Sequence, residues 1–322
     1  MPPDRLYGCT IGLVTAGAIQ SIADFAFAIL RMAPVLVSCY KMENVDTKKR
    51  ISGPKWLESG HAAQALLVAA ITKTLARLRI WASYLAMVAA GFVFFLFFRF
   101  PFNFTRVHGR KNIPPRGERV LFISNHTTMY DSFLIAVAAY FPKIIFYPSL
   151  PFINFAAREN FFRTRFFKML FTLLRTVPVE RRDHPWLMRK YVEFLQRNNL
   201  LIFYQGTRTD DLYVIKNGPA FAIAHAPSPI TVIPVYHQGI ERIFTKGGPK
   251  TRGLWRWLPR SIFRCPVVIF GQPIDFSECF RIRETRSRIA AINQRIVASI
   301  VSLKSLASCP GQPANLTATA RY

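Results

Sequence analysis

The stretch "LFISNHTTMYDSF" (121–133) decides the fold, because an apolar run ends abruptly in a polar turn. Short apolar runs bounded by turn residues are typical of buried strands. The run is followed by Asn125 and two threonines, whose side chains are good caps for the first turn of a helix. The pattern therefore predicts a strand, a tight turn that holds His126, and a helix that begins near Asp131.

His126 and Asp131 are candidates for an acid–base pair. Five residues on one helix turn through about 500°, so the two side chains would diverge by about 140° if both were helical. They meet only if His126 lies in the turn and Asp131 in the first helical turn. One imidazole nitrogen then donates to the carboxylate, and the other is left as a base of fixed tautomer. No G-x-S-x-G elbow is present, so the histidine would act directly on a substrate hydroxyl. A capped turn without chemistry is the alternative that these residues leave open.

Further along the chain, short apolar runs alternate with segments of helical periodicity. The predicted strands cover residues 119–124, 200–205, 231–236 and 267–271, and the predicted helices cover 131–140, 161–174, 186–197 and 284–303. Alternation of this kind predicts an α/β fold. We expect a central mixed sheet flanked by helices and preceded by an N-terminal membrane helix or helices.

Composition points to an anionic partner that also has an apolar side. The chain has 322 residues, of which 51% are hydrophobic and 29 are Phe, and its net charge is +26. A phospholipid surface fits both properties. Nucleic acid is not expected, because zinc-ligand spacings, RNA-binding aromatic signatures and a heptad-linked basic region are all missing from the sequence. The five cysteines are scattered, which argues against a disulfide framework and favours a reducing compartment.

Three segments are candidates for contact with a membrane. Residues 80–98 are 19 uncharged residues between two arginines, and a helix of this length spans about 28 Å, close to a hydrocarbon core of about 30 Å. A buried core helix is the alternative. Residues 6–30 are a second apolar segment, and 41–60 form a polar linker. Residues 154–175 interleave Phe with Arg and Lys, a composition that predicts a helix lying in the membrane interface.

A second group of candidate residues follows the predicted strand at 200–205. In "QGTRT" (205–209), Gly206 lets backbone N–H groups approach an anion, and Thr207 and Arg208 add a hydroxyl and a guanidinium. Arg181 follows another short strand-like stretch. An ordinary turn with surface arginines is the alternative interpretation. The remaining histidines, His237 among them, have no acidic residue at a recognisable spacing and are expected to be structural or on the surface.

Four short blocks together resemble those of the glycerolipid acyltransferases, the 1-acylglycerol-3-phosphate acyltransferase family. "NHTTMYD" resembles the N-H-x4-D block, "VPVER" the second block, "QGTRT" the third and "VIPV" the fourth, in the family's order across residues 125–235. "PVYHQGIE" is also similar to the corresponding stretch of the tafazzins, transacylases of the same superfamily. Each block is short, but four in order are a strong signal.

The resemblance implies roles for the candidate residues. His126 would be the general base and Asp131 would orient it. The acceptor's phosphate would be held by Gly206, Thr207 and Arg208, with help from Arg181. Pro234 would shape the acyl or acceptor pocket, and Asn125 or nearby amides would stabilise the oxyanion. Gln205 stands where the family most often has Glu, which puts the choice of acceptor in doubt.

The resemblance also implies an activity and a domain plan. The donor would be an acyl thioester on coenzyme A or acyl carrier protein, the acceptor a lysophospholipid, most simply 1-acylglycerol-3-phosphate, and neither a metal nor another cofactor is implied. The expected domains are an apolar segment and basic linker at 1–75, a membrane-embedded helix at 76–105, the acyltransferase domain at 106–303 and a flexible tail at 304–322. The catalytic domain would meet membrane phospholipids from the cytoplasmic side. The alternatives are a transacylase, an acyltransferase for another lysolipid, or an inactive lipid-binding relative.

Overall fold

A computed structural model describes residues 55–99, 101–115, 118–147, 150–162, 164–180, 184–226, 230–244 and 258–308. The chain divides into two compact units, Met1–Ile71 and Thr72–Tyr322. The apolar segment predicted at residues 6–30, most of the linker after it and the tail beyond residue 308 lie outside the described residues. The second unit holds the fold that follows.

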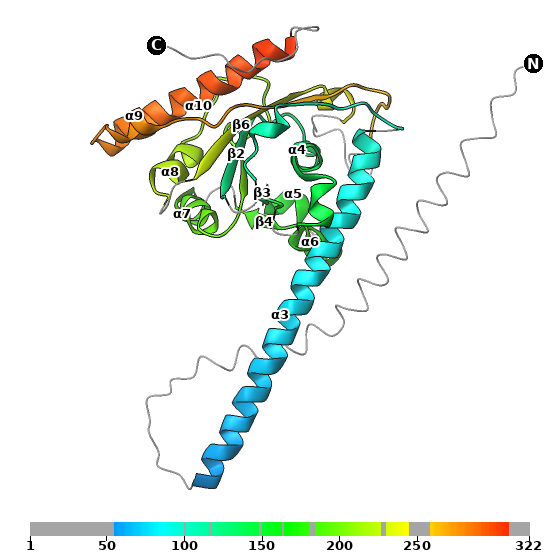
Figure 1. Ribbon diagram of the computed structural model, residues 1–322, viewed down its shortest axis with the longest axis vertical. Coiled ribbons are helices and arrows are strands. Elements are labelled where there is room, and N and C mark those ends of the chain that lie inside the picture. Colours follow the sequence, from blue (N-terminus) through cyan, green and yellow to red (C-terminus); the bar gives the residue numbers. More distant parts are fainter. Residues whose placement is uncertain are drawn as a thin grey trace, which may run out of the picture. The chain divides into compact units, whose positions relative to one another are not determined.

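The second unit is built on a twisted sheet whose strands appear in Figure 1. Its strands are β1 Arg106–His108, β2 Val120–Ser124, β3 Ile153–Ala157, β4 Thr176–Val179, β5 Leu200–Phe203, β6 Thr231–Gln238 and β7 Val267–Phe270. They lie in the order β1-β7-β6-β2-β5-β3-β4. The β6–β7 pair is antiparallel, and the other neighbouring strands are parallel. The predicted mixed α/β sheet is confirmed.

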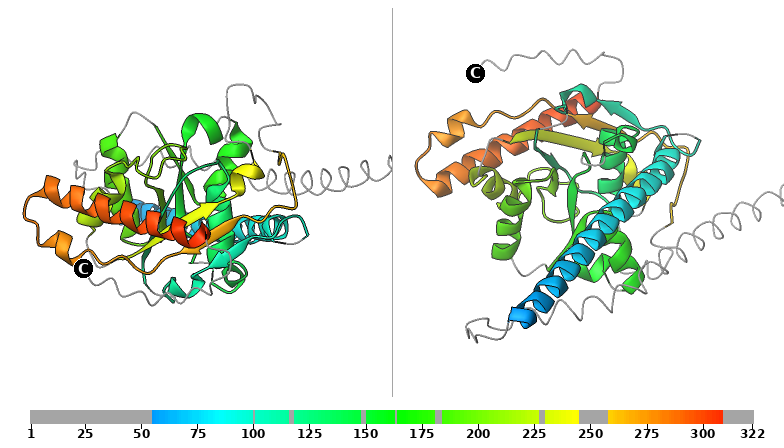
Figure 2. Two further views of the ribbon diagram at one scale, coloured as in Figure 1. Left: turned by 90° about the horizontal axis from the view of Figure 1, so that it is seen from above. Right: turned by 60° about the horizontal axis from the view of Figure 1, so that its bottom comes forward.

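Helices cover both faces of this sheet (Figures 1 and 2). They are α3 Lys55–Phe98, α4 Asp131–Tyr140, α5 Arg158–Phe161, α6 Arg165–Leu173, α7 His184–Leu195, α8 Gly218–Ala224, α9 Ser277–Phe280 and α10 Thr285–Ser308, with short 3-10 turns η1 Arg110–Asn112, η2 Lys143–Ile145 and η3 Ile240–Arg242. One apolar core joins the sheet to α7, α8 and α10. A second core joins the opposite face to α4 and the end of α3.

Strand β2 lies in the middle of the sheet and is buried along its whole length. Leu121 and Ile123 belong to one core, whereas Val120 and Phe122 belong to the other. A strand covered on both faces needs apolar residues at every position, because successive side chains point to opposite sides. This explains why the apolar run of β2 is continuous.

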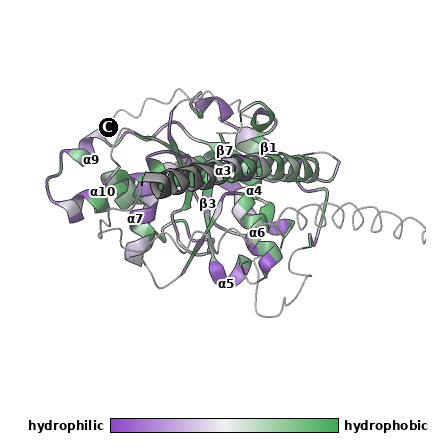
Figure 3. Ribbon diagram, turned by 90° about the horizontal axis from the view of Figure 1, so that it is seen from below, coloured by the Kyte–Doolittle hydropathy of each residue, from purple (hydrophilic) through white to green (hydrophobic). Residues whose placement is uncertain are grey.

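The helix predicted over residues 161–174 is confirmed over Arg165–Leu173, whereas the longer interfacial helix predicted over 154–175 is wrong at its start, which is a strand. The segment begins as β3, continues as the single turn α5, and restarts as α6. Strand β3 pairs with β4 and β5, so tertiary pairing outweighs the helical look of the Phe/Arg pattern. Thr164 caps α6 by accepting a hydrogen bond from the Phe167 N–H at 3.2 Å. Helix α6 contains both apolar and polar residues, as its mixed colouring in Figure 3 shows.

Within the second unit, residues 72–98 of α3 lie against the domain with one side only. Met87 and Phe98 are buried, and the Ser83 hydroxyl donates to the Leu173 carbonyl at 2.6 Å. The opposite side exposes large apolar side chains, with Leu85 60% and Val93 61% accessible. Two helical stretches in the described part of the chain, Ala70–Phe98 and Thr285–Ala307, have the length and composition to cross a membrane. The second contributes buried isoleucines to a core, as a packed helix does.

Candidate active site

The site lies at the carboxyl edge of the parallel strands β2, β5 and β6. Ser124, the last residue of β2, is level with Phe203 at the end of β5 and with Val235 in β6. The chain leaving these strands therefore meets at one place, which is where open α/β sheets position ligands. Of the four sequence blocks, those at β2, β5 and β6 meet here, whereas "VPVER" begins in β4 at the edge of the sheet.

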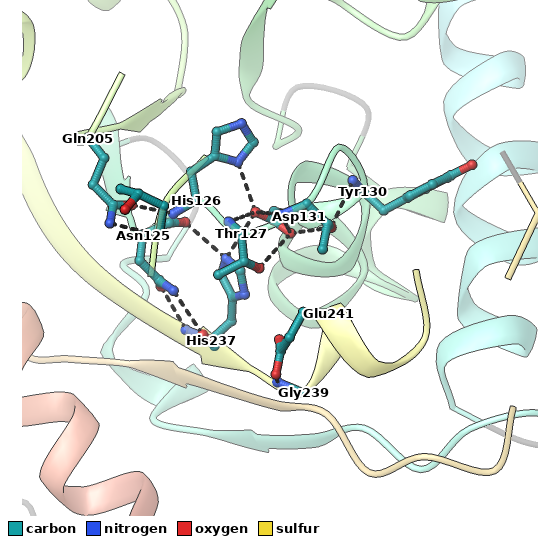
Figure 4. Close-up of polar contacts among 11 residues, drawn as sticks. Asn125, His126, Thr127, Tyr130, Asp131, Gln205, His237, Gly239 and Glu241 are labelled. Atoms are coloured by element: carbon teal, nitrogen blue, oxygen red, sulfur yellow. Dashed lines mark hydrogen bonds and ion pairs between the residues drawn. The ribbon is translucent and has the colours of Figure 1, made fainter. Parts of the chain in front are cut away.

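His126 and Asp131 are brought together as the turn predicted. The His126 Nδ1 lies 2.8 Å from Asp131 Oδ2, and Asp131 is the first residue of α4. The imidazole ring stacks on Phe203 with ring centroids 4.1 Å apart. Figure 4 shows its other nitrogen pointing away from the carboxylate. The His126 side chain is 21% exposed and that of Asp131 is 0% exposed, so the base meets solvent while its partner does not.

The Asp131 carboxylate is held by the turn that precedes α4. It accepts hydrogen bonds from the Thr127 N–H at 2.6 Å, the Thr128 N–H at 2.9 Å and the Thr128 hydroxyl at 2.6 Å. Burial alone would raise its pKa, but the nearby His237 and the hydrogen bonds from His126 and Thr128 outweigh burial and set the pKa at about 2. Asp131 is therefore ionised at neutral pH and holds a proton on the facing nitrogen of His126.

Sequence reasoning missed the second histidine of this site. His237 is 0% exposed, and its Nε2 lies 3.5 Å from Asp131 Oδ2. It was expected to be structural or on the surface because no acidic residue stands at a recognisable spacing; its acidic neighbour is distant in sequence and reaches it through the alignment of β6 with β2. A histidine at the end of a strand that runs parallel to β2 was the available signal.

Gln205 is fully buried and bonds to main-chain groups at both ends of its amide. Its Oε1 accepts from the His126 N–H at 2.6 Å, and its Nε2 donates to the carbonyls of Thr209 at 3.2 Å and Asp211 at 2.7 Å. The side chain thus ties the loop after β5 to the backbone of His126. A carboxylate at this position would face two carbonyl oxygens, so the amide suits this chain where Glu would not.

The loop after β5 passes directly beside His126. Gly206 has a φ of +67°, and a Cβ there would come within 2.8 Å of Lys216, so the tight turn requires glycine. The Thr209 N–H donates to the His126 carbonyl at 2.9 Å. Thr207 is exposed and Arg208 is half-buried in this loop. Their roles as phosphate ligands stay predictions, and the predicted Arg181 lies outside the described residues.

Asn125 and Pro234 have structural surroundings in the sheet. The Asn125 amide is paired with the main chain of His237, accepting from its N–H at 3.0 Å and donating to its carbonyl at 2.9 Å. Pro234 is buried in β6. Its ring packs close to Gly271, where a larger residue would collide with it. Pro234 is not among the residues that line the apolar cavity described next. The predicted roles of both residues toward substrate stay predictions.

An apolar cavity of about 90 Å³ lies between the end of α3, α4 and the β3–β4 side of the sheet. Met129 and Ser132, which flank Asp131 closely in the chain, contribute to its wall. Met87, Gly91 and Phe94 of α3 line it as well, so the same helix side that packs on the domain closes the cavity. Among the described residues, no group of three or more His, Cys, Asp or Glu side chains is placed to hold a metal ion.

Comparison with known proteins gives a family model and similar solved structures. Residues 104–238 match the family model described as Acyltransferase. The crystal structure of the 1-acyl-sn-glycerophosphate (LPA) acyltransferase PlsC from Thermotoga maritima has a TM-score of 0.43 and 16% sequence identity, and the match covers 65% of this chain and 74% of that chain. No curated protein matches the chain. The family match spans β1 to β6 and includes His126, Asp131, Gln205 and His237.

Proposed function

We propose that this chain is an acyltransferase of the glycerolipid acyltransferase superfamily with an acyl thioester donor and a lysophospholipid acceptor, and its match to the Acyltransferase family model over residues 104–238 supports this. The acceptor we expect first is 1-acylglycerol-3-phosphate, which would be converted to phosphatidic acid. The single observation that carries the proposal is the His126–Asp131 contact of 2.8 Å beside an apolar cavity at the sheet edge.

The chemistry follows from the orientation of His126. With Nδ1 donating to Asp131, the outward Nε2 is free of a proton and takes one from the acceptor hydroxyl. The oxygen attacks the thioester carbonyl carbon, and the C–S bond of the tetrahedral intermediate then breaks. The imidazolium returns its proton to the thiolate that leaves. The buried Asp131 carboxylate stabilises the imidazolium between these steps, and no covalent acyl-enzyme forms.

The apolar lining of the cavity is the reason that we place the acyl part of the donor beside it. Its wall includes Met129 and Ser132, so a chain placed in it has its thioester end near the first turn of α4, where Asp131 orients the base. Aliphatic chains bind well in concave apolar sites with few polar groups. The loop at Gly206–Arg208 lies on the other side of His126 and is where we place the acceptor's phosphate. The two substrates would then approach the imidazole from opposite sides.

A membrane surface would supply the acceptor. Residues 72–98 of α3 expose Trp81, Leu85 and Val93 on the side away from the domain, whereas the packed side lines the cavity. A helix used in this way suits a position in the bilayer interface beside the domain. The net charge of +26 favours anionic phospholipids. We place the protein on the membrane, with its catalytic domain on the cytoplasmic side.

The test is acyl transfer by the detergent-purified full chain from labelled acyl-CoA, and from acyl carrier protein, to a panel of lysolipids. We expect transfer to 1-acylglycerol-3-phosphate and a loss of at least about 10³-fold in kcat in His126→Ala, because the base is removed. His225→Ala is the matched control, since His225 is exposed on α8. Transfer from a phospholipid instead of a thioester would favour a transacylase. A folded protein that transfers to no acceptor would overturn the proposal.

A further inference from the structure

We propose that His237 is a positioning residue for the acyl-transfer reaction: its Nε2, 3.5 Å from the same Asp131 oxygen that orients His126, places a polar N–H beside that carboxylate and so sets how strongly the carboxylate polarises the catalytic imidazole. The inference rests on the proposed function for its kinetic test. It starts from the contacts of the His237 ring, which Figure 4 shows below Asp131 and next to Asn125.

The first step is the position of the proton on His237. Its Nε2 faces two oxygens, the Asn125 carbonyl at 2.9 Å and Asp131 Oδ2 at 3.5 Å. Its Nδ1 is buried and has no hydrogen-bond partner among the described residues. An N–H is needed where acceptors converge and is costly where none exists. The ring therefore carries its proton on Nε2, which bonds the Asn125 carbonyl and lies in electrostatic contact with the Asp131 carboxylate.

The second step is that the two histidines share one atom. Asp131 Oδ2 accepts from His126 Nδ1 at 2.8 Å and lies 3.5 Å from His237 Nε2. A donor that competes for this oxygen reduces the negative charge that His126 feels, so the carboxylate supports the imidazolium less strongly. Since the His237 side chain is 0% exposed, it does not face a substrate and acts through its neighbours Asp131 and Asn125.

The third step is that the ring is held rigidly. The main chain of His237 forms two hydrogen bonds with the Asn125 side chain, and its Nε2 bonds the Asn125 carbonyl. Asn125 directly precedes His126, so the end of β6 and the start of the catalytic turn move as one piece. A fixed partner of this kind holds a catalytic group in a productive geometry without touching the substrate.

The test compares His237→Leu with His237→Gln in the full chain. Leucine fills a similar volume but removes the donor, whereas glutamine extends an amide N–H toward the place of Nε2. We expect kcat to fall about tenfold in His237→Leu, because the Asp131 carboxylate loses a fixed neighbour and holds the imidazole less firmly in one orientation, with little change in KM, and most of the activity to return in His237→Gln. His225→Leu is the control and should change neither quantity.

The pH profile separates positioning from a merely structural role. Without the competing donor, Asp131 should favour the charged form of His126 more, so the acid limb of kcat/KM moves to higher pH by about half a unit in His237→Leu and stays in place in His237→Gln. The groups nearest to the His126–Asp131 pair are Asp131 itself and His237 of β6. The other charged side chains at this edge are Arg208, Asp210, Asp211 and Lys216 on the loop after β5, and Glu241 on η3. None of these other charged residues is changed in the variants. A loss of kcat with an unmoved limb, or a limb that moves to lower pH, overturns the proposal.

A second measurement keeps this inference separate from the proposed function. The His126 ring, assigned by its loss in His126→Ala, can be titrated by NMR with labelled histidine in detergent, which needs no turnover. We expect its midpoint to rise in His237→Leu and to be restored in His237→Gln. If the wild type is inactive but the titration of His126 still shifts in His237→Leu, the proposed enzymatic function is wrong and the coupling between the two histidines stands. Equal titrations in wild type and His237→Leu would sink the coupling alone.

Discussion

The carboxyl edge of β2, β5 and β6 and the outer side of α3 over residues 72–98 are built in opposite ways. At the edge, polar side chains are buried and bonded, and Asp131 and Gln205 are both 0% exposed. On α3, apolar side chains are exposed, with Leu85 at 60% and Val93 at 61%. Buried polar groups need defined partners, so the edge specifies a geometry and hence a reaction. Exposed apolar side chains can pack on any apolar surface, so the outer side of α3 determines where the protein binds and not which reaction it catalyses.

The variant expected to lose most activity changes Asp131, the side chain with the most hydrogen bonds at the carboxyl edge. Asp131→Asn keeps the shape but replaces one oxygen by an amide that donates, so it no longer fixes the proton on His126 Nδ1 and opposes the Thr127 and Thr128 N–H groups. We expect kcat to fall by about 10³- to 10⁴-fold, the range seen when a triad carboxylate is neutralised. Steady-state acyl transfer measures it. Asp275→Asn, at an exposed aspartate, is the control, and an Asp131→Asn variant within tenfold of wild type would contradict the role.

The sequence was informative where a rule is local. Strand β2, the start of α4 at Asp131 and the His126–Asp131 contact all follow from one continuous stretch, in which an apolar run, a polar turn and a helix come in order. The predicted helix cap from Asn125 and the threonines is wrong, since Tyr130 is the N-cap and makes no side-chain cap hydrogen bond. Strand β3 was misread as helix because its partners β4 and β5 lie elsewhere in the chain. His237 was missed for the same reason, since the register of β6 on β2, and no sequence spacing, brings it to Asp131.

The second prediction concerns how the stability of the protein depends on pH through Asp131. The pKa of Asp131 is about 2, against an ordinary value of 3.8, because its partners outweigh burial. A carboxyl whose pKa is lower in the folded state contributes stability that is complete above about pH 4 and is lost as pH falls toward 2. We expect the free energy of unfolding to fall by about 2 kcal/mol across this window in the wild type. Denaturant unfolding in detergent from pH 6 to pH 2 measures the fall.

Asp131→Asn supplies the reference for that measurement. The variant has no group to protonate at this position, so its stability should lose about 2 kcal/mol less over the same window. The two curves should therefore converge at low pH. Parallel curves would mean that Asp131 is not held in its ionised form by the fold.

A smaller effect belongs to the outer side of α3. Leu85→Glu places a charge among exposed apolar residues, so it should weaken binding to anionic phospholipid vesicles about tenfold while kcat in detergent micelles stays unchanged. Co-sedimentation with vesicles measures the binding. Ala290→Glu introduces the same charge at an exposed position of α10 and should change neither property. Equal loss of binding in both variants would show that overall charge, and not this side of α3, directs the protein to the membrane.

The smallest effect tests whether the edge needs an amide at Gln205. Gln205→Glu places a buried carboxyl opposite the carbonyls of Thr209 and Asp211, which accept hydrogen bonds from the amide at 3.2 and 2.7 Å. Buried in this way, the new carboxyl favours its protonated form, which donates one hydrogen bond where the amide donates two. The loss of one bond predicts activity about fivefold below wild type.

The dependence of this loss on pH decides between two readings of Gln205. The ratio of variant to wild-type activity cancels the titration of His126, which both proteins share. If the amide holds the loop as its contacts indicate, the ratio should fall further as pH rises and the carboxyl loses its proton, because an ionised oxygen then repels both carbonyls. A ratio at or above one across the range would mean that the loop accommodates a carboxylate, and that Gln205 is exchangeable for Glu in this chain. Because Gln205→Glu leaves α3 untouched, vesicle binding should be unchanged in either case, which keeps the chemistry of the edge and the surface of the helix experimentally separate.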